Sequence, residues 1–116
     1  MDRKSFTLCI AEVPAYADRD SYISDMALSP LWGDDPDTEI PQKRIEALAQ
    51  VWAATNRPVR EIAAVAGLSQ RKLAERFMIP YRTMEDWCRG ARECPIYVRL
   101  MMQECLGLFS SLIEIA

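Results

Sequence analysis

The segment LSQRKLAERFMIPYRTMEDWCRG, residues 68–90, decides the fold of this 116-residue chain. Its pattern predicts two short amphipathic helices joined by a tight turn. Ser69 suits the cap of the first helix, because its hydroxyl can accept from backbone N–H groups that have no partner inside the helix. Pro80 suits the first turn of the second helix, and Gly90 suits its end in a left-handed conformation. Two helices of about eight residues are unstable alone in water, so the flanking sequence must supply their core.

Apolar residues recur at helical spacing inside this segment and on both sides of it. Within the segment we assign to the core Leu73, Ala74, Phe77, Met84 and Trp87. The spacing outside it predicts helices over 20–28, 41–55, 59–66 and about 95–110. In the first of these we expect a cap at Asp20-Ser21 and an inner face of Tyr22, Ile23, Met26 and Ala27 that extends to Leu28. In the last we expect an inner face of Val98, Met101, Met102, Cys105, Phe109, Leu112 and Ile113.

The central segment resembles the helix-turn-helix of the phage repressor/Cro-type (XRE) DNA-binding proteins. The residues that match in register are Leu68-Ser69-Gln70, Leu73-Ala74, Ile79, Thr83-Met84, Trp87, Gly90 and Pro95, and the resemblance covers roughly residues 58–107. Two positions depart from the family pattern. Met78 replaces the turn glycine, which implies either strain or an altered turn, because φ is often positive there. Cys88 replaces the Glu after Trp, which removes a polar contact that helps to hold the turn after the second helix.

The resemblance implies sequence-specific binding of double-stranded DNA, with the second helix in the major groove and its N-terminal residues at base edges. The base-reading candidates are Tyr81, Arg82 and Asp86. The candidates for phosphate or other backbone contacts are Gln70, Arg71, Thr83, Arg89 and Arg92. Arg82 is the best base reader, because its planar fork can bind guanine O6 and N7 together. As an alternative, Arg82, Glu85, Asp86 and Arg89 are spaced to pair with one another on a solvated helix face.

The fold class predicted is mainly α: a bundle of five to six helices that contains the helix-turn-helix at 69–90. Residues 6–13, FTLCIAEV, are β-prone, so we expect a short N-terminal strand or arm there. We divide the chain into an N-terminal extension, residues 1–40, and a helical DNA-binding-like domain, residues 41–116. The extension includes a polar loop at 33–39, whose carboxylates lack the spacing of a calcium-binding EF-hand, so we expect a solvated loop that supplies helix caps.

The charge of the chain is unevenly distributed, although its net charge is only −3. Residues 1–56 carry five basic and ten acidic side chains, residues 57–92 carry eight and four, and residues 93–116 carry one and three. The basic excess therefore lies on the central segment, where phosphate neutralisation would need it. The acidic first half is suited to a protein partner of opposite charge.

Several classes of function are disfavoured by what the chain contains. It has four cysteines without CxxC spacing and no histidine, so we expect free thiols, no metal or other cofactor, and no enzymatic activity. The start, Met1-Asp2-Arg3-Lys4, is not followed by a sustained apolar run, so we expect no signal peptide. Charged residues interrupt the longest apolar region, residues 96–115, so we expect no membrane span and a cytoplasmic protein.

Two functional hypotheses remain. The first is a transcriptional regulator of the repressor/Cro type, a class frequent on phages and other mobile elements, acting as a homodimer because one such module reads only about half a site. The apolar C-terminal helix and the surroundings of Trp32 are its candidate dimer surfaces. The alternative is an antitoxin- or inhibitor-like protein-interaction module that keeps the fold without binding DNA. The overall acidity and the balanced charge of the second helix favour this alternative.

Overall fold

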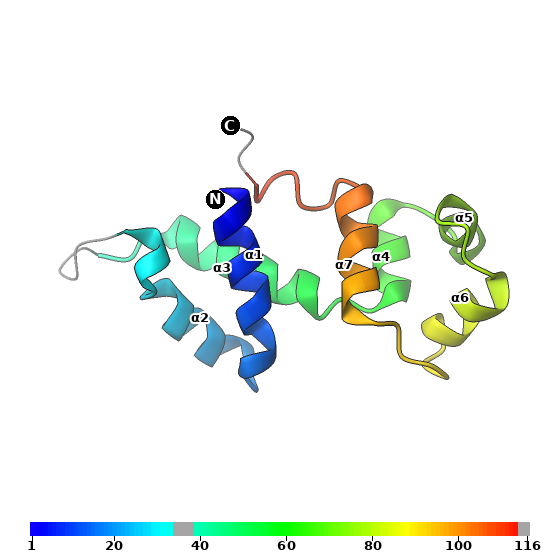
Figure 1. Ribbon diagram of the computed structural model, residues 1–116, viewed down its shortest axis with the longest axis horizontal. Helices are drawn as coiled ribbons and strands as arrows, with labels where there is room; N and C mark the ends of the chain where they lie inside the picture. The colour runs from blue at the N-terminus through cyan, green and yellow to red at the C-terminus, as the bar shows by residue number, and fades with distance from the viewer. Residues whose placement is uncertain (34–38, 114–116) are drawn as a thin grey trace. The chain divides into compact units, whose positions relative to one another are not determined.

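The computed structural model describes residues 1–33 and 39–113, and this part of the protein is mainly helical, as the sequence predicts. Its α-helices are α1 (Arg3–Glu12), α2 (Arg19–Ala27), α3 (Gln42–Thr55), α4 (Val59–Ala66), α5 (Gln70–Arg76), α6 (Tyr81–Cys88) and α7 (Ile96–Cys105) (Figure 1). Short 3₁₀ turns lie at Val13–Ala15 and Pro30–Trp32. None of the helices in the described ranges is long and apolar enough to cross a bilayer. Most of the acidic loop expected at 33–39, namely residues 34–38, lies outside the described residues.

The chain divides into two compact units. Unit 1 contains residues 1–55 and the end of the chain from residue 111, and unit 2 contains residues 56–110. This division differs from the one we expected after residue 40, because α3 packs against α1 and α2. The helix that we had assigned to the DNA-binding-like domain therefore belongs to the N-terminal unit.

Residues 3–12 form the helix α1, so the prediction of a strand or arm at 6–13 was wrong. The Asp2 carboxylate accepts a hydrogen bond of 2.7 Å from the Ser5 N–H and caps this helix. Phe6 and Cys9 are buried on one face, at a spacing that suits a helix and not a strand. This additional helix brings the number in the described residues to seven, one above the predicted range.

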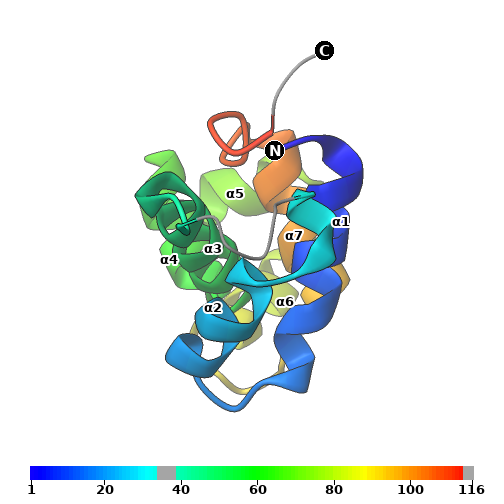
Figure 2. The same ribbon diagram turned by 90° about the vertical axis from the view of Figure 1, so that its left-hand side faces the viewer.

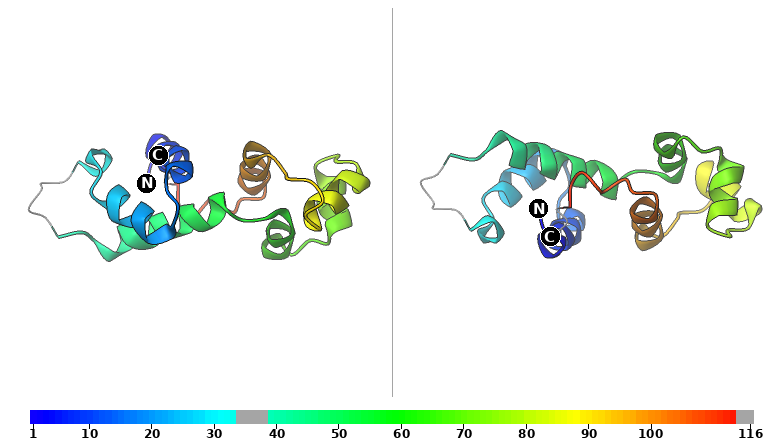
Figure 3. Two further views of the ribbon diagram at one scale, coloured as in Figure 1. Left: turned by 90° about the horizontal axis from the view of Figure 1, so that it is seen from below. Right: turned by 90° about the horizontal axis from the view of Figure 1, so that it is seen from above.

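The chain reverses after α1 and continues into α2, which packs against α3 (Figures 2 and 3). Asp18 caps α2 by accepting 2.8 Å from the Ser21 N–H, so the cap lies before the predicted Asp20-Ser21 pair. Of the residues predicted to face inward, Tyr22, Ile23, Met26 and Ala27 are buried. The prediction was wrong for Leu28, which is 72% exposed because the helix ends at Ala27. The Tyr22 hydroxyl donates 2.8 Å to the Cys9 carbonyl and links α2 to α1.

Trp32, a candidate for the dimer surface, is half-buried and held within unit 1. Its indole N–H donates 2.8 Å to the Met26 carbonyl, and the Arg44 guanidinium lies 4.6 Å from its ring centroid. Arg44 also donates 3.1 Å to the Ala27 carbonyl, so it joins α3 to the end of α2. A cation over an aromatic face adds to this packing.

Unit 2 is built around α4, which contacts α5, α6 and α7 (Figure 1). Its core contains the buried residues Val59, Ile62, Ala63, Leu73, Ala74, Met84, Cys94 and Met102. Helix α4 spans the predicted residues and ends at Gly67, whose φ is +71°. That left-handed conformation costs glycine little, because it has no Cβ.

Helix α7 ends at Cys105, earlier than the predicted end near residue 110. Gly107 has φ +74°, and the Leu108 N–H bonds back to the Gln103 carbonyl at 3.0 Å, which closes the helix. The predicted inner face is therefore right for Met102, which is buried, and wrong for Met101, which is 58% exposed, and for Cys105. Beyond the helix end, Phe109 and Leu112 are buried as expected.

Candidate nucleic-acid interface

Helix α5 begins and ends as the sequence predicts. Its N-terminus is capped by the Ser69 hydroxyl, which accepts 3.1 Å from the Lys72 N–H. At its end, the N–H groups of Met78 and Ile79 return to the carbonyls of Glu75 and Ala74, at 3.3 and 2.9 Å. This pair of bonds is the Schellman arrangement, which requires a left-handed residue after the helix.

Met78 is that left-handed residue, with φ +55°, and it is the one non-glycine residue with positive φ among those the structure describes. The expected strain is therefore present, because a Cβ makes this conformation unfavourable. The side chain gains no packing in return, since it is 91% exposed. The turn between α5 and α6 keeps its glycine-type geometry although it lacks the glycine.

Helix α6 is anchored by one deeply buried side chain and ended by a second Schellman arrangement. Met84 is fully buried in the core of unit 2. Gly90 has φ +79°, and the N–H groups of Gly90 and Ala91 bond to the carbonyls of Trp87 and Asp86, at 3.4 and 2.9 Å. The end predicted at Gly90 is confirmed. The same turn brings the residues after Gly90 back toward the last turn of α6.

The starts of α5 and α6 lie close together. The Arg71 guanidinium carbon is 4.2 Å from the centroid of the Tyr81 ring. Arg71, a candidate for backbone contacts, therefore packs over the ring of Tyr81, a candidate base reader. Gln70 is exposed as the first residue of α5, and Thr83 is half-buried on α6. Arg82 extends into solvent, with 84% of its side chain exposed. These candidates thus occupy the N-terminal ends of the two helices.

Asp86 differs from the other candidates, because its side chain is only 9% exposed. Three arginines surround its carboxylate. Arg89 donates from Nη2 to Oδ1 at 2.8 Å, the Nε of Arg92 lies 3.7 Å from Oδ2, and the Nε of Arg82 lies 4.0 Å from Oδ1. We call these four residues the Asp86 cluster. A buried carboxylate with three cationic neighbours is poorly placed to accept from a cytosine edge, so we no longer assign a base-reading role to Asp86.

The Asp86 cluster also corrects two expectations about α6. Ion pairing occurs on this helix, but around a buried carboxylate instead of on a solvated face. It includes Arg92, whereas Glu85 is exposed and lies outside the cluster. The turn after α6 was expected to lose a polar contact at Cys88. Asp86 supplies one instead, because its backbone carbonyl also accepts 3.2 Å from the Arg92 N–H.

The sequence could signal part of this cluster. Arg82 and Arg89 are four residues before and three after Asp86, a spacing that places side chains on one helix face. Arg92 lies beyond the helix, and its approach depends on the reversal at Gly90. No helical periodicity continues through such a turn, so sequence spacing alone gives no sign of this third partner.

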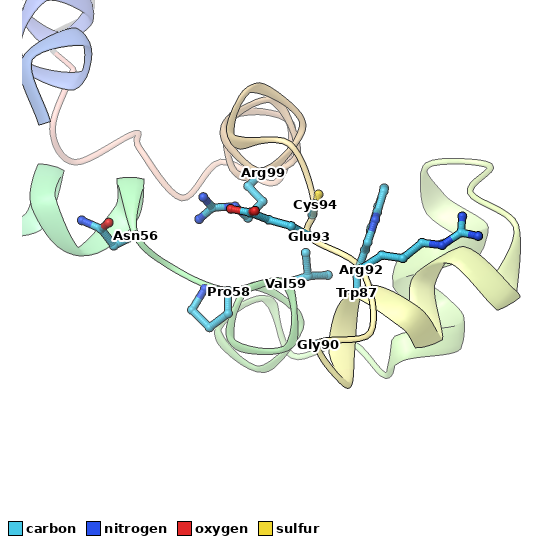
Figure 4. Close-up of a pocket in the computed structure, with 9 residues that line it drawn as sticks. All are labelled: Asn56, Pro58, Val59, Trp87, Gly90, Arg92, Glu93, Cys94 and Arg99. Atoms are coloured by element: carbon cyan, nitrogen blue, oxygen red, sulfur yellow. The ribbon is translucent and has the colours of Figure 1, made fainter. Parts of the chain in front are cut away.

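A cavity of about 330 Å³, which the sequence analysis missed, lies at the C-terminal end of α6 (Figure 4). Its lining residues are Asn56, Pro58, Val59, Trp87, Gly90, Arg92, Glu93, Cys94 and Arg99. Arg99 donates 2.9 Å to the Arg57 carbonyl. Burial raises the pKa of the Cys94 thiol to about 11, so this thiol is protonated and a weak nucleophile at neutral pH. In Figure 4 the Arg92 side chain extends away from Glu93 and Arg99.

No known family model, curated protein or solved structure matches this chain. In the described ranges, no group of three or more His, Cys, Asp or Glu side chains is arranged to hold a metal ion.

Proposed function

We propose that the protein binds double-stranded DNA sequence-specifically through α5 and α6 and acts as a transcriptional regulator of the repressor/Cro type. The observation that carries this proposal is the group of exposed arginines on α6 and the turn after it. The side chains of Arg82, Arg89 and Arg92 are 84, 65 and 71% exposed, although all three lie within 4.0 Å of one carboxylate. Exposed guanidinium groups that converge around one carboxylate are suited to phosphates and guanine edges.

The charge of unit 2 supports the same proposal. Residues 56–110 carry nine basic and six acidic side chains, whereas the whole chain is acidic. Nine minus six gives unit 2 a net charge of +3, and one of its six carboxylates, that of Asp86, is paired with arginines. A basic surface attracts the phosphate backbone before any base is read.

In this proposal Arg82 reads a base, and Tyr81 contacts a thymine methyl group or a phosphate. Arg71 braces Tyr81 from α5 and contacts a phosphate. Gln70 and Thr83 make backbone contacts, as do Arg89 and Arg92. The protein acts as a homodimer, because a second module about one helical turn away supplies the affinity that half a site lacks. We place it in the cytoplasm, where DNA is accessible.

Salt-dependent binding to a generic duplex tests the proposal. We expect affinity to fall steeply as salt rises, because bound arginines release counterions from the phosphates. The second substrate is the selected site, which is the DNA sequence enriched by the protein from a random pool of duplexes. On this site, Arg82→Ala should relax the preference for one base, and Arg71→Ala should weaken binding to all duplexes alike. Arg19→Ala is the matched control, since Arg19 is an exposed arginine of unit 1 that pairs with Asp20 at 3.3 Å. Failure to retain any duplex at low salt would reject the proposal.

One observation favours the alternative, an antitoxin- or inhibitor-like module that binds a protein. An apolar groove of about 270 Å³ lies in unit 2, lined by Phe77, Ile79, Val98, Met101, Met102 and Cys105. Flexible methionine side chains suit a surface that adapts to an apolar partner. If this function is the right one, Met101→Asp should abolish partner binding, and the Arg82→Ala variant should bind the partner normally.

A further inference from the structure

The Asp86 cluster has a geometry that suggests more than an ion pair. Asp86 is in the last turn of α6, where the helix dipole places negative charge, so an isolated carboxylate there is unfavourable. The carboxylate is nevertheless buried, while the guanidinium groups around it remain exposed. Burial restricts the carboxylate, which lies within 4.0 Å of a nitrogen of each of three long side chains. Free arginine side chains sample many rotamers.

The three arginines come from different positions along the binding surface. Arg82 is on the first turn of α6, Arg89 is at its end, and Arg92 follows the reversal at Gly90. Their contacts with Asp86 also differ, because Arg89 makes a direct hydrogen bond of 2.8 Å whereas Arg82 and Arg92 lie 4.0 and 3.7 Å away. The carboxylate therefore attracts the side chains of Arg82 and Arg92 by charge at these distances, without a hydrogen bond.

We propose that Asp86 is a specificity-determining positioning residue, which aims Arg82 at a base, whereas Arg89 and Arg92 contact phosphates whether or not Asp86 is charged. The inference rests on the proposed DNA binding and goes beyond it, because it assigns selectivity to a residue that touches no base. Positioned guanidinium groups lose less rotamer freedom on binding, and the gain is largest where the geometry must match a bidentate guanine edge. The carboxylate also repels phosphates, so it weakens non-specific binding.

This arrangement predicts opposite changes in two measurable quantities. With Asp86→Asn, the shape is kept and the negative charge is lost. We expect affinity for a generic duplex to stay equal or rise, because a repulsive charge is removed from the surface. We expect discrimination between the selected site and the same site with its guanine replaced to fall by about tenfold or more, the order that a bidentate contact supplies.

Glu85→Gln is the matched control. It removes the same charge from the neighbouring position of α6, where the side chain is exposed and outside the cluster. We expect this variant to keep wild-type discrimination. In an Arg82→Ala background, Asp86→Asn should produce no further loss of discrimination, because residues that act through one another are not additive.

The experiment measures the affinities of the wild-type chain and these variants for the generic duplex and for the selected site with and without its guanine. Thermal unfolding and NMR relaxation at the arginine Nε–H groups are measured on the same proteins. Asp86→Asn should stay folded, because the arginines that lose their partner are already solvated. The Nε–H groups of Arg82 and Arg92 should become more mobile in Asp86→Asn and not in Glu85→Gln.

Unchanged discrimination in Asp86→Asn, or an equal loss in Glu85→Gln, would overturn the inference and leave the proposed DNA binding intact. If Asp86→Asn loses affinity for the generic duplex and for the selected site in proportion to a loss of folded protein, the role of Asp86 is structural only. That result also overturns the inference. If the wild type retains no duplex at low salt, the proposed function fails and the inference fails with it.

Discussion

Helices α1 and α2 of unit 1 begin after aspartates, whereas no helix of unit 2 begins after an acidic residue. Helix α3 of unit 1 follows Pro41, α4, α6 and α7 of unit 2 also begin after prolines, and α5 begins after Ser69. The carboxylates of Asp2 and Asp18 accept hydrogen bonds from first-turn N–H groups. Pro58, Pro80 and Pro95 offer no side-chain cap to the helices that follow them. Helix α4 has Glu61 in its first turn, whereas the first turns of α6 and α7 contain no acidic side chain. The starts of α6 and α7 therefore keep their partial positive charge, which favours an external anion.

The two units also use their acidic side chains differently. By sequence, residues 1–55 with 111–116 carry eleven acidic and five basic side chains, whereas residues 56–110 carry six and nine. In unit 1 the carboxylates of Asp2 and Asp18 stabilise helix starts. In unit 2 Asp86 lies near a helix end and is compensated by arginines. Two carboxylates of unit 1 thus complete helix starts, whereas one carboxylate of unit 2 pairs with arginines.

The largest expected effect is the loss of stability when a core leucine of either unit is truncated. Leu73 in unit 2 and Leu48 in unit 1 are both fully buried. Either change to alanine should lower the free energy of unfolding by about 2–5 kcal/mol, because it leaves a cavity. Denaturant titration followed by NMR should show that Leu73→Ala perturbs α5 and α6 most. A loss under about 1 kcal/mol for either variant would mean that the core is assigned wrongly.

The next effect tests the difference in charge. Arg89→Ala should weaken binding to a generic duplex and reduce the slope of log K against log salt by about 0.9, the contribution of one phosphate contact. Arg19→Ala, the equivalent change in unit 1, should leave that slope unchanged. The slopes are measured by fluorescence anisotropy at several salt concentrations. Equal changes in the two variants would remove the distinction between the units.

A smaller effect is expected at the turn of unit 2. Met78→Gly should raise the free energy of unfolding by up to about 1 kcal/mol, because glycine relieves the left-handed strain and partly offsets that gain by its own chain entropy. The reverse change at an equivalent turn, Gly67→Ala, should destabilise the protein, since Gly67 has φ +71°. Thermal unfolding measures both. A destabilised Met78→Gly variant would contradict the assigned backbone strain.

The smallest effect concerns pH. Hydrogen bonds from Ser5 and Ser21 lower the pKa of Asp2 and Asp18 below 3.8. Because the folded pKa is depressed, the stabilisation is present above the unfolded value and is lost as the pH falls through the folded value. Amide NMR shifts of α1 and α2 should therefore indicate fraying below about pH 4. The hydroxyl cap of Ser69 on α5 should show no such change.

The parts of the fold that the sequence predicts are those fixed by local chemistry. Ser69, Gly67 and Gly90 mark helix boundaries because capping involves only neighbouring backbone groups. The helix at 3–12 was missed, because its residues are β-prone in isolation and become helical through the Asp2 cap and packing against α3. The early end of α7 was missed because the apolar pattern continues past Gly107.

The same distinction between local chemistry and packing applies to the candidate site. The match to the family pattern placed the candidate contacts at the starts of α5 and α6, because these positions follow from the alignment of the matching residues. It assigned Asp86 to a base, because burial of that side chain depends on the reversal at Gly90 and on Arg92, which comes from beyond the helix. The cavity beside Trp87 was also missed, since its lining residues come from separate parts of the sequence.

Selection of bound duplexes from a random pool tests the central claim most directly, because it yields a consensus and its symmetry together. We predict an enriched site with a guanine at the position that Arg82 contacts, repeated as a palindrome about one helical turn apart. The Arg82→Ala variant should lose the preference at that guanine and keep the remainder of the consensus. A pool that shows no enrichment over its input, at a salt concentration where the protein is folded, would contradict the claim.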